Sequence, residues 1–194
     1  TSSLSGSYTS ACAAKQIYES ENEGKRVLVI DTLSTGPEIA LAIEKVEEFV
    51  EAGMPYEEIC QSITQYIKRT GLLFMLKSLK SLANNGRVSP IAAKLVGIVG
   101  IGVVGKASNE GTLEQMHKCR GERRALETIV TDLEAEGFRS GKISIGHCRN
   151  ESAALQLKEL ILSKFKNAMI EIHKLRGLCS FYAEKGGLLV GFEK

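Results

Sequence analysis

The sequence lacks tryptophan, has only three prolines, and contains five cysteines with no C-x-x-C pair. An odd number of scattered cysteines argues against a disulfide framework and against a structural zinc site. It favours a reducing, cytoplasmic environment. No apolar run approaches the ~18 residues that a membrane-spanning helix needs, and no charged-then-apolar leader opens the chain. We therefore expect neither secretion nor an integral membrane protein.

Charge and histidine content exclude two further classes. The 25 basic and 23 acidic residues leave a net charge of only +2, and the basic residues are scattered, so nucleic acid is not expected as a partner. The three histidines, His117, His147 and His173, are not grouped with carboxylates or cysteines at ligand spacing. We predict no metal and no cofactor.

The 194 residues, 43% of them hydrophobic, suffice for one large or two small globular domains. In the first 72 residues, a serine-rich loop at 1–8 runs into a helix-favouring stretch at 11–18. Residues 27–30 are a continuous apolar run, mostly β-branched, of the kind buried in a parallel sheet. Apolar residues at helical spacing predict two further helices, one from Ile39 to Val50 and one from Tyr56 to Ile67.

From about residue 72 the pattern changes. An apolar strand at 72–76 precedes a short helix that ends at Asn84-Asn85-Gly86, where glycine can adopt the left-handed cap. A helix with apolar residues on nearly every face is predicted from Ile91 to Ile101. Further helices are predicted around 126–133 and 151–166, and further strands at 103–108, 112–119, 142–147, 169–175 and 188–192.

The predicted fold class is α/β, with α+β character overall. Residues 1–72 are expected to form part of a parallel α/β/α domain. Residues 73–194 are expected to form a second domain with a mixed or antiparallel sheet and helices.

Three stretches, in this order, resemble the DegV family of bacterial lipid-binding proteins: SSLSGSY at 2–8, LKSLANNGRVS at 79–89 and YAEKGGLLVGF at 182–192. The resemblance spans essentially the whole chain. Family members carry a strand, a helix and a threonine-containing loop before the serine motif, so the chain resembles a DegV protein without its N-terminal part.

The resemblance implies a two-domain protein that binds a long-chain fatty acid. The carboxylate is expected at the domain junction and the acyl chain in an apolar tunnel. Such a protein is not itself an enzyme, and it presents the acid to a separate fatty acid kinase.

The resemblance also assigns roles to particular residues. Ser5 and Gly6 would bind the head group, with Ser5 donating its hydroxyl beside free N–H groups at a helix N-terminus. The alternative is that Ser5 only caps that helix. Arg120 is expected near the head group, and Tyr182 stands where family members often carry histidine. Arg87 is the second arginine candidate, or else it fastens the loop between domains.

The acyl chain is assigned to the apolar helix after Ser89. Ile91, Leu95 and Ile98 could line a tunnel or fill an ordinary core, because both require the same side chains. The resemblance favours the tunnel.

Two other functions remain open from the sequence. One is an enzyme that handles a phosphorylated or nucleotide small molecule, with the serine loop cradling phosphate and Arg87 and Arg120 clamping it. The chain lacks a G-x-S-x-G elbow, a P-loop, an H-E-x-x-H motif and a complete dinucleotide fingerprint, which weakens that case. The other is a purely structural interaction module, in which a filled core replaces the tunnel.

Overall fold

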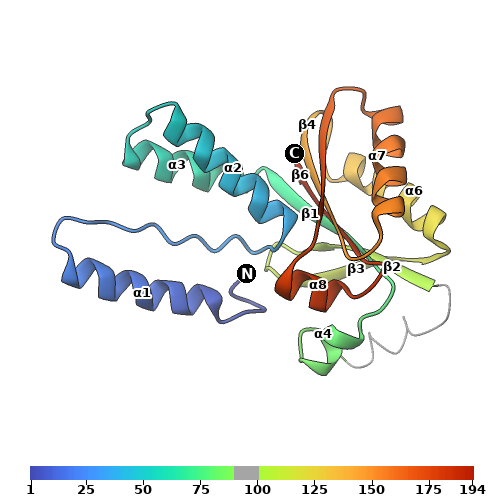
Figure 1. The fold of residues 1–194 in the computed structure, drawn as a ribbon, viewed down its shortest axis with the longest axis horizontal. Coiled ribbons are helices and arrows are strands. Elements are labelled where there is room, and N and C mark those ends of the chain that lie inside the picture. The colour runs from blue at the N-terminus through green and yellow to red at the C-terminus, as the bar shows by residue number, and fades with distance from the viewer. Residues whose placement is uncertain (90–100) are drawn as a thin grey trace.

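The computed structural model describes residues 1–89 and 101–194, and Figure 1 shows the arrangement of its elements. The described helices are α1 (Ser7–Glu21), α2 (Pro37–Glu51), α3 (Tyr56–Ile67), α4 (Lys80–Asn84), α6 (Glu122–Ala135), α7 (Glu151–Lys164) and α8 (Gly177–Ala183). The described strands are β1 (Thr70–Leu76), β2 (Ile101–Ala107), β3 (Leu113–Arg120), β4 (Gly141–His147), β5 (Ala168–Lys174) and β6 (Leu188–Glu193).

The strands form one six-stranded mixed sheet in the order β3-β2-β1-β6-β4-β5. β4 and β5 run parallel, which requires a crossover connection, and α7 provides it. The other neighbouring strands are antiparallel. Leu73 of β1 lies opposite both Lys106 and Val190 in the centre of the sheet. The expectation of a mixed sheet is confirmed.

One face of the sheet carries the main hydrophobic core. α6 packs on β1, β2 and β3, while α7 packs on β4 and β5. The apolar positions that predicted α6 are all buried: Leu126, Ile129, Val130 and Leu133. Phe138 closes this core, with edge-to-face ring contacts to Phe165 at 5.0 Å and to Phe192 at 6.4 Å between centroids.

The opposite face carries a second, smaller apolar cluster. Side chains alternate along β1, so that Leu73 and Met75 enter the main core while Leu72, Phe74 and Leu76 enter the second cluster. Leu79 and Leu82, before and within α4, and Ala183 of α8 cover part of this second face. α2, α4 and α8 lie on this side in Figure 1, away from α6 and α7.

α2 approaches the sheet at a glycine. A Cβ on Gly191 of β6 would lie 2.5 Å from the backbone nitrogen of Glu38 and 2.6 Å from the carbonyl carbon of Pro37. Glu38 is itself buried, and it accepts hydrogen bonds from Ser34 and, at 2.6 Å, from Thr70 Oγ1. These contacts fix the start of α2 against β1 and β6.

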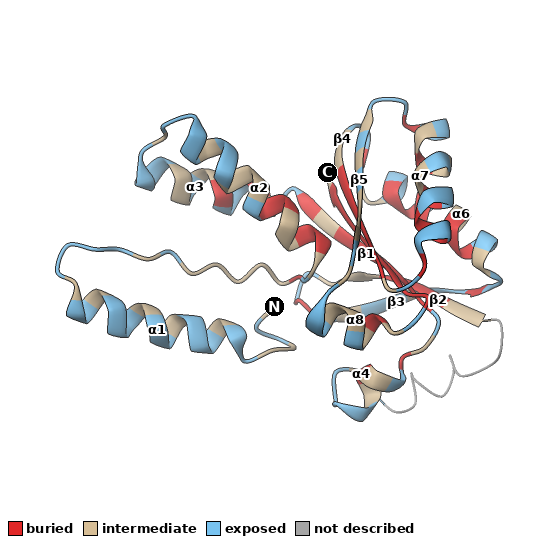
Figure 2. Cartoon of the chain, in the orientation of Figure 1, coloured by how far each residue is buried: buried red, intermediate tan, exposed pale blue. Residues whose placement is uncertain are grey.

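α1 and the extended segment after it run side by side away from the sheet, and neither is buried in Figure 2. The expected strand at 27–30 was wrong for this structure, because among the described residues no neighbouring strand pairs with it. The Val27 N–H donates instead to Glu19 Oε1 at 2.8 Å. Exposed apolar side chains gather here and on the outer side of α2: Ile17, Tyr18, Leu28, Ile43 and Val50.

The remaining predictions divide into three groups. α1 to α4, α6, α7 and the strands from β1 to β6 are found close to their expected bounds. The apolar positions that predicted α2 were Ile39, Ile43, Val46 and Val50. Val46 packs against a buried cluster that includes Leu41 and Ala42, whereas Ile43 and Val50 are exposed, so the predicted face was partly wrong. α8 was missed, and of the helix expected at 91–101 only Ile101, which begins β2, lies within the described residues.

The division into residues 1–72 and 73–194 stays a prediction. β1 spans that position, and α2 contacts β1, β4 and β6.

We expect Gly191→Ala to lower the free energy of unfolding by about 1–3 kcal/mol, because the added methyl group collides with the α2 backbone, which cannot move as a flexible side chain could. Gly102→Ala in β2 is the matched control, since its Cβ would meet only Leu76 O at 3.6 Å. Chemical denaturation measures both. Equal effects of the two substitutions would contradict the close approach of α2.

The buried Glu38 predicts a dependence of stability on pH. Burial raises its pKa above the ordinary 4.5, although hydrogen bonds from Ser34 and Thr70 oppose the shift. The folded state therefore binds the proton more tightly than the unfolded state does, and stability falls as pH rises above 4.5. Relative to Glu38→Gln, the wild type should lose stability through this window and level off above the folded-state pKa. A difference between the two proteins that is constant from pH 4 to 8 would contradict this.

Candidate functional site

The serine loop, residues 1–7, rests on the turn between β2 and β3. Thr1 Oγ1 donates to Gly111 O at 2.7 Å, and Ser3 Oγ donates to Glu110 O. Gly111 has φ +74°, and a Cβ there would lie 2.3 Å from Thr1 Oγ1. Only glycine therefore fits the turn and admits the loop.

Two charged residues hold the loop from other directions. The Ser2 N–H donates to Asp31 Oδ1 at 3.0 Å, and Arg87 Nε donates to Leu4 O at 3.0 Å. Burial acts to raise the pKa of Asp31, but hydrogen bonds from Ser2 and Leu33 outweigh it and lower the pKa below its ordinary value. The loop is thus tied to three segments that are distant in sequence.

Ser5 and Gly6 lie where this loop enters α1. Ser5 Oγ is 2.9 Å from Ser7 Oγ and accepts the Ser7 N–H at 3.3 Å, but Gly6 occupies the N-cap position of α1 and no side chain of the described residues caps the helix, so the capping role considered from the sequence is not found. Within the part of the chain that the structure describes, the N–H groups of Tyr8 and Thr9 have no acceptor. A Cβ on Gly6 would meet no atom within 4 Å. These open donors could bind an anion.

An apolar pocket of about 220 Å³ lies beside the loop on the second face of the sheet. Its apolar wall consists of Phe74, Leu79, Val88, Val103 and Leu113. Arg87 lines the pocket and also bonds the serine loop, so the two features adjoin. Ligand pockets commonly measure ~300–1,000 Å³, so this one has room for only part of a long chain.

Tyr182 reaches the same face from the C-terminal end of the chain. It lies in α8, packs against the second apolar cluster and contacts the Phe181 ring at 5.0 Å. Ser5, Arg87 and Tyr182 thus come to one side of the sheet from three distant parts of the sequence.

Arg120 does not join them. It ends β3 opposite Ile101, whereas the serine loop contacts the turn before Leu113. At about 3.4 Å per residue, Leu113 and Arg120 are roughly 24 Å apart along the strand. The structure does not bring Arg120 to the serine loop, because the antiparallel hairpin places it at the other end of β3. Ile91, Leu95 and Ile98 lie outside the described residues.

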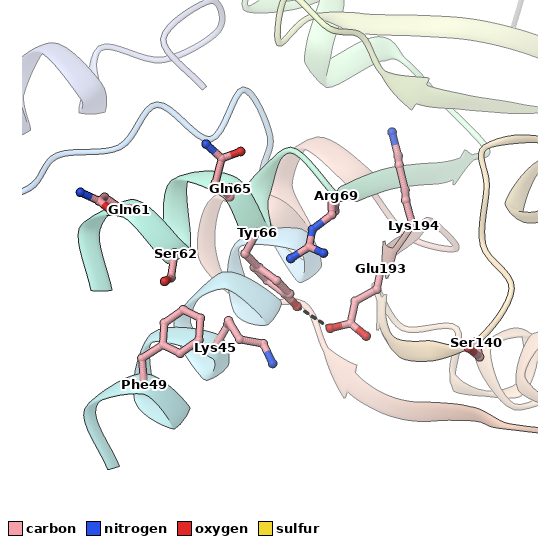
Figure 3. Close-up of a pocket in the computed structure, with 10 residues that line it drawn as sticks. All are labelled: Lys45, Phe49, Gln61, Ser62, Gln65, Tyr66, Arg69, Ser140, Glu193 and Lys194. Atoms are coloured by element: carbon pink, nitrogen blue, oxygen red, sulfur yellow. Dashed lines mark hydrogen bonds between the residues drawn. The ribbon is translucent and has the colours of Figure 1, made fainter. Parts of the chain in front are cut away.

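A larger hollow of about 750 Å³ lies between α2, α3 and the end of β6 (Figure 3). Lys45, Arg69 and Lys194 line it, and Tyr66 donates a hydrogen bond to Glu193 at 2.9 Å. Burial and the Glu193 carboxylate raise the pKa of Tyr66. The charged lining is unsuited to an acyl chain.

The histidines make ordinary structural contacts. His117 Nε2 lies 3.0 Å from Asp132 Oδ1, whose carboxyl pKa is raised by burial. His147 Nδ1 accepts the Asn150 N–H at 3.3 Å, and His173 Nδ1 lies 3.4 Å from Ser144 Oγ. Residues 1–89 and 101–194 contain no group of three or more His, Cys, Asp or Glu that could hold a metal. No helix in those ranges is long and apolar enough to cross a membrane.

Two anchoring residues were not identified as such from the sequence. Asp31 follows the apolar run at 27–30, and a polar residue at such a position is a recognised signal for a site at the end of a strand. Gly111 lies between the strands predicted at 103–108 and 112–119, but its contact with Thr1 spans 110 residues of sequence.

The chain matches one family of proteins along its full length. The model of the DegV family, described as uncharacterised protein, matches residues 1–194. The chain belongs to the DegV family.

Individual relatives agree with this assignment. DegV domain-containing proteins from Streptococcus pyogenes serotype M1 and Streptococcus pneumoniae R6 are 40% and 42% identical over 193 residues, which cover 100% of this chain and 69% of each relative. A DegV family protein from Eubacterium eligens, solved loaded with heptadecanoic acid, is 39% identical with a TM-score of 0.97 over 100% of this chain and 70% of its own. The Fatty Acid Kinase (Fak) B3 protein of Streptococcus pneumoniae, loaded with linoleic acid, is 41% identical with a TM-score of 0.97, covering 100% and 69%.

We expect Arg87→Ala to loosen the serine loop, because Leu4 O loses its donor. Amide hydrogen exchange in residues 2–7 should become about threefold to tenfold faster, which corresponds to the loss of one ordinary hydrogen bond of about 1 kcal/mol. Arg123→Ala is the control, since Arg123 is an exposed arginine of α6 that pairs with Glu127. Unchanged exchange in Arg87→Ala would show that the loop does not depend on this bond.

Proposed function

We propose that this protein binds a long-chain fatty acid, with the carboxylate at the serine loop and the acyl chain along the second face of the sheet. The observation that carries the proposal is the junction of two environments at Arg87. On one side are the hydroxyl and N–H groups of the serine loop, and on the other is an apolar pocket.

The chemistry of the loop suits a single carboxylate. Ser5 can donate its hydroxyl, and the N–H groups of Tyr8 and Thr9 at the start of α1 add donors and a partial positive charge. Arg87 supplies a full positive charge nearby. Because its side chain is exposed, this charge carries no cost of removal from water. An acyl chain would gain from contact with Phe74, Leu79 and Val103.

The relatives support the same ligand class. Two solved structures that share 39% and 41% identity with this chain were loaded with fatty acids. One of those proteins is named as a fatty acid kinase B protein, which supports a role in presenting the acid to a separate kinase subunit. On this proposal the chain is a carrier without catalytic activity of its own.

Several finer assignments remain part of the proposal. Tyr182 would take the place of a family histidine and approach the head group from α8, and the head group would lie at the junction of the two expected domains. The tail-lining role expected of Ile91, Leu95 and Ile98 falls outside the described residues. Arg120, expected to pair with the carboxylate or an acyl phosphate, would have to do so from the far end of β3, away from the serine loop.

The alternative is a phosphate-handling enzyme that uses Arg87 and Arg120 as a clamp. The position of Arg120, at the far end of β3 from the serine loop, argues against it. The apolar wall of the pocket also argues against it, because a phosphate group loses hydration next to apolar side chains and gains no compensating contact from them.

The decisive experiment is extraction of the denatured, purified protein with organic solvent, followed by mass spectrometry. Wild type should release near-stoichiometric fatty acid. Ser5→Ala should bind linoleic acid roughly tenfold to a hundredfold more weakly, as for a lost hydrogen bond to a charged group. Ser20→Ala, which removes an exposed hydroxyl bonded to Ile17 O on the same helix, should bind as wild type does.

Wild-type protein that yields no lipid and binds no added linoleic acid would refute the carrier function. Equal binding by Ser5→Ala and wild type would refute the head-group assignment alone.

A further inference from the structure

Glu184 has an unfavourable backbone conformation immediately after α8. Its φ of 54° and ψ of 174° lie in a region that essentially only glycine occupies without strain. The turn that follows is tight, since a Cβ on Gly187 would lie 2.3 Å from Ala183 O. Glycine is available to the chain at positions 186 and 187, yet glutamate occupies the strained position.

The side chain of Glu184 makes a specific contact with α4. Glu184 Oε1 accepts the Ser81 N–H at 2.8 Å, across 103 positions of sequence. α4 begins after Leu79, which provides no side-chain cap, so this carboxylate satisfies a donor in the first turn that the helix leaves open. α4 and α8 also contact each other directly.

The other end of α4 leads to the serine loop. The Arg87 N–H donates to Leu82 O at 2.8 Å, which fixes Arg87 to the end of the helix. Arg87 Nε then donates to Leu4 O, next to Ser5. Glu184 is therefore connected to the serine loop through α4. It bonds the first turn of α4, and Arg87, which is bonded to the last turn, bonds the loop.

We propose that Glu184 is a positioning residue: its carboxylate fixes α4 against α8, so that α4 holds Arg87 at the serine loop and Leu79 at the wall of the apolar pocket. The backbone strain is tolerated because glycine, which would relieve it, has no side chain to reach Ser81. The expected effect of Glu184 on ligand retention rests on the proposed fatty-acid binding. Its role in fixing the position of α4 is independent of that proposal.

Two substitutions separate this role from a general contribution to stability. Glu184→Gly removes the acceptor and relieves the strain, so its melting temperature should equal or exceed that of wild type. It should nevertheless release bound linoleic acid about tenfold faster, because α4 and Arg87 lose their fixed position. Glu184→Gln keeps an amide oxygen that can accept the Ser81 N–H, and should release the acid at nearly the wild-type rate.

Amide hydrogen exchange provides a measurement that does not need lipid. Exchange in residues 80–84 and in the serine loop should be faster in Glu184→Gly than in wild type or Glu184→Gln. Wild-type exchange and wild-type lipid release in Glu184→Gly would overturn the proposal. So would a lowered melting temperature together with the faster release, or the same behaviour in Glu184→Gln and Glu184→Gly.

Failure of the proposed function would be distinguishable from failure of this inference. If wild type binds no linoleic acid, the carrier function is refuted and hydrogen exchange alone decides the role of Glu184. Faster exchange in Glu184→Gly then supports the positioning role, and unchanged exchange overturns it.

Discussion

β1 is buried on both faces, and the two faces are covered in different ways. Leu73 and Met75 enter a core closed by α6 and α7, while Leu72, Phe74 and Leu76 meet a looser cover of short helices. A strand with two apolar faces requires two apolar layers. The first layer stabilises the sheet, and the second leaves the pocket beside Arg87.

The proposed site depends on contacts between segments that are far apart in the chain. The serine loop is held by the β2–β3 turn, by Asp31 and by Arg87. None of these bonds involves an apolar side chain, so the loop can present polar groups at the edge of an apolar pocket without filling it. A site for an amphipathic ligand needs one polar, fixed end and one apolar, open end. Arg87 lies where the two meet, because it bonds the loop and also lines the pocket.

The structure brings some of the predicted site residues together and separates others, because a motif does not show at which end of a strand its residues will lie. Ser5 and Arg87 lie in different motifs, and one hydrogen bond from Arg87 to Leu4 joins them. Arg120 was expected at the same head group, but the hairpin carries it to the far end of β3. For the segment 27–30, composition predicted a strand, but a strand also requires a neighbour to pair with, which the described residues do not supply. α8 was missed because it has only seven residues, too few for a repeated apolar period, although Cys179, Tyr182 and Ala183 share one face and pack against the second apolar cluster.

The sequence alone determined the type and order of most elements, because apolar periodicity and the glycine at the end of α4 act over a few residues. It also determined the family, because three motifs occur in order along the chain. Tertiary structure decided which faces are buried, as the outward position of Ile43 and Val50 shows. It also decided which motif residues meet, and it revealed the strained Glu184 beside Ser81. Such contacts join segments 83 residues apart, for Arg87 and Leu4, or 103 residues apart, for Ser81 and Glu184, which no local pattern encodes.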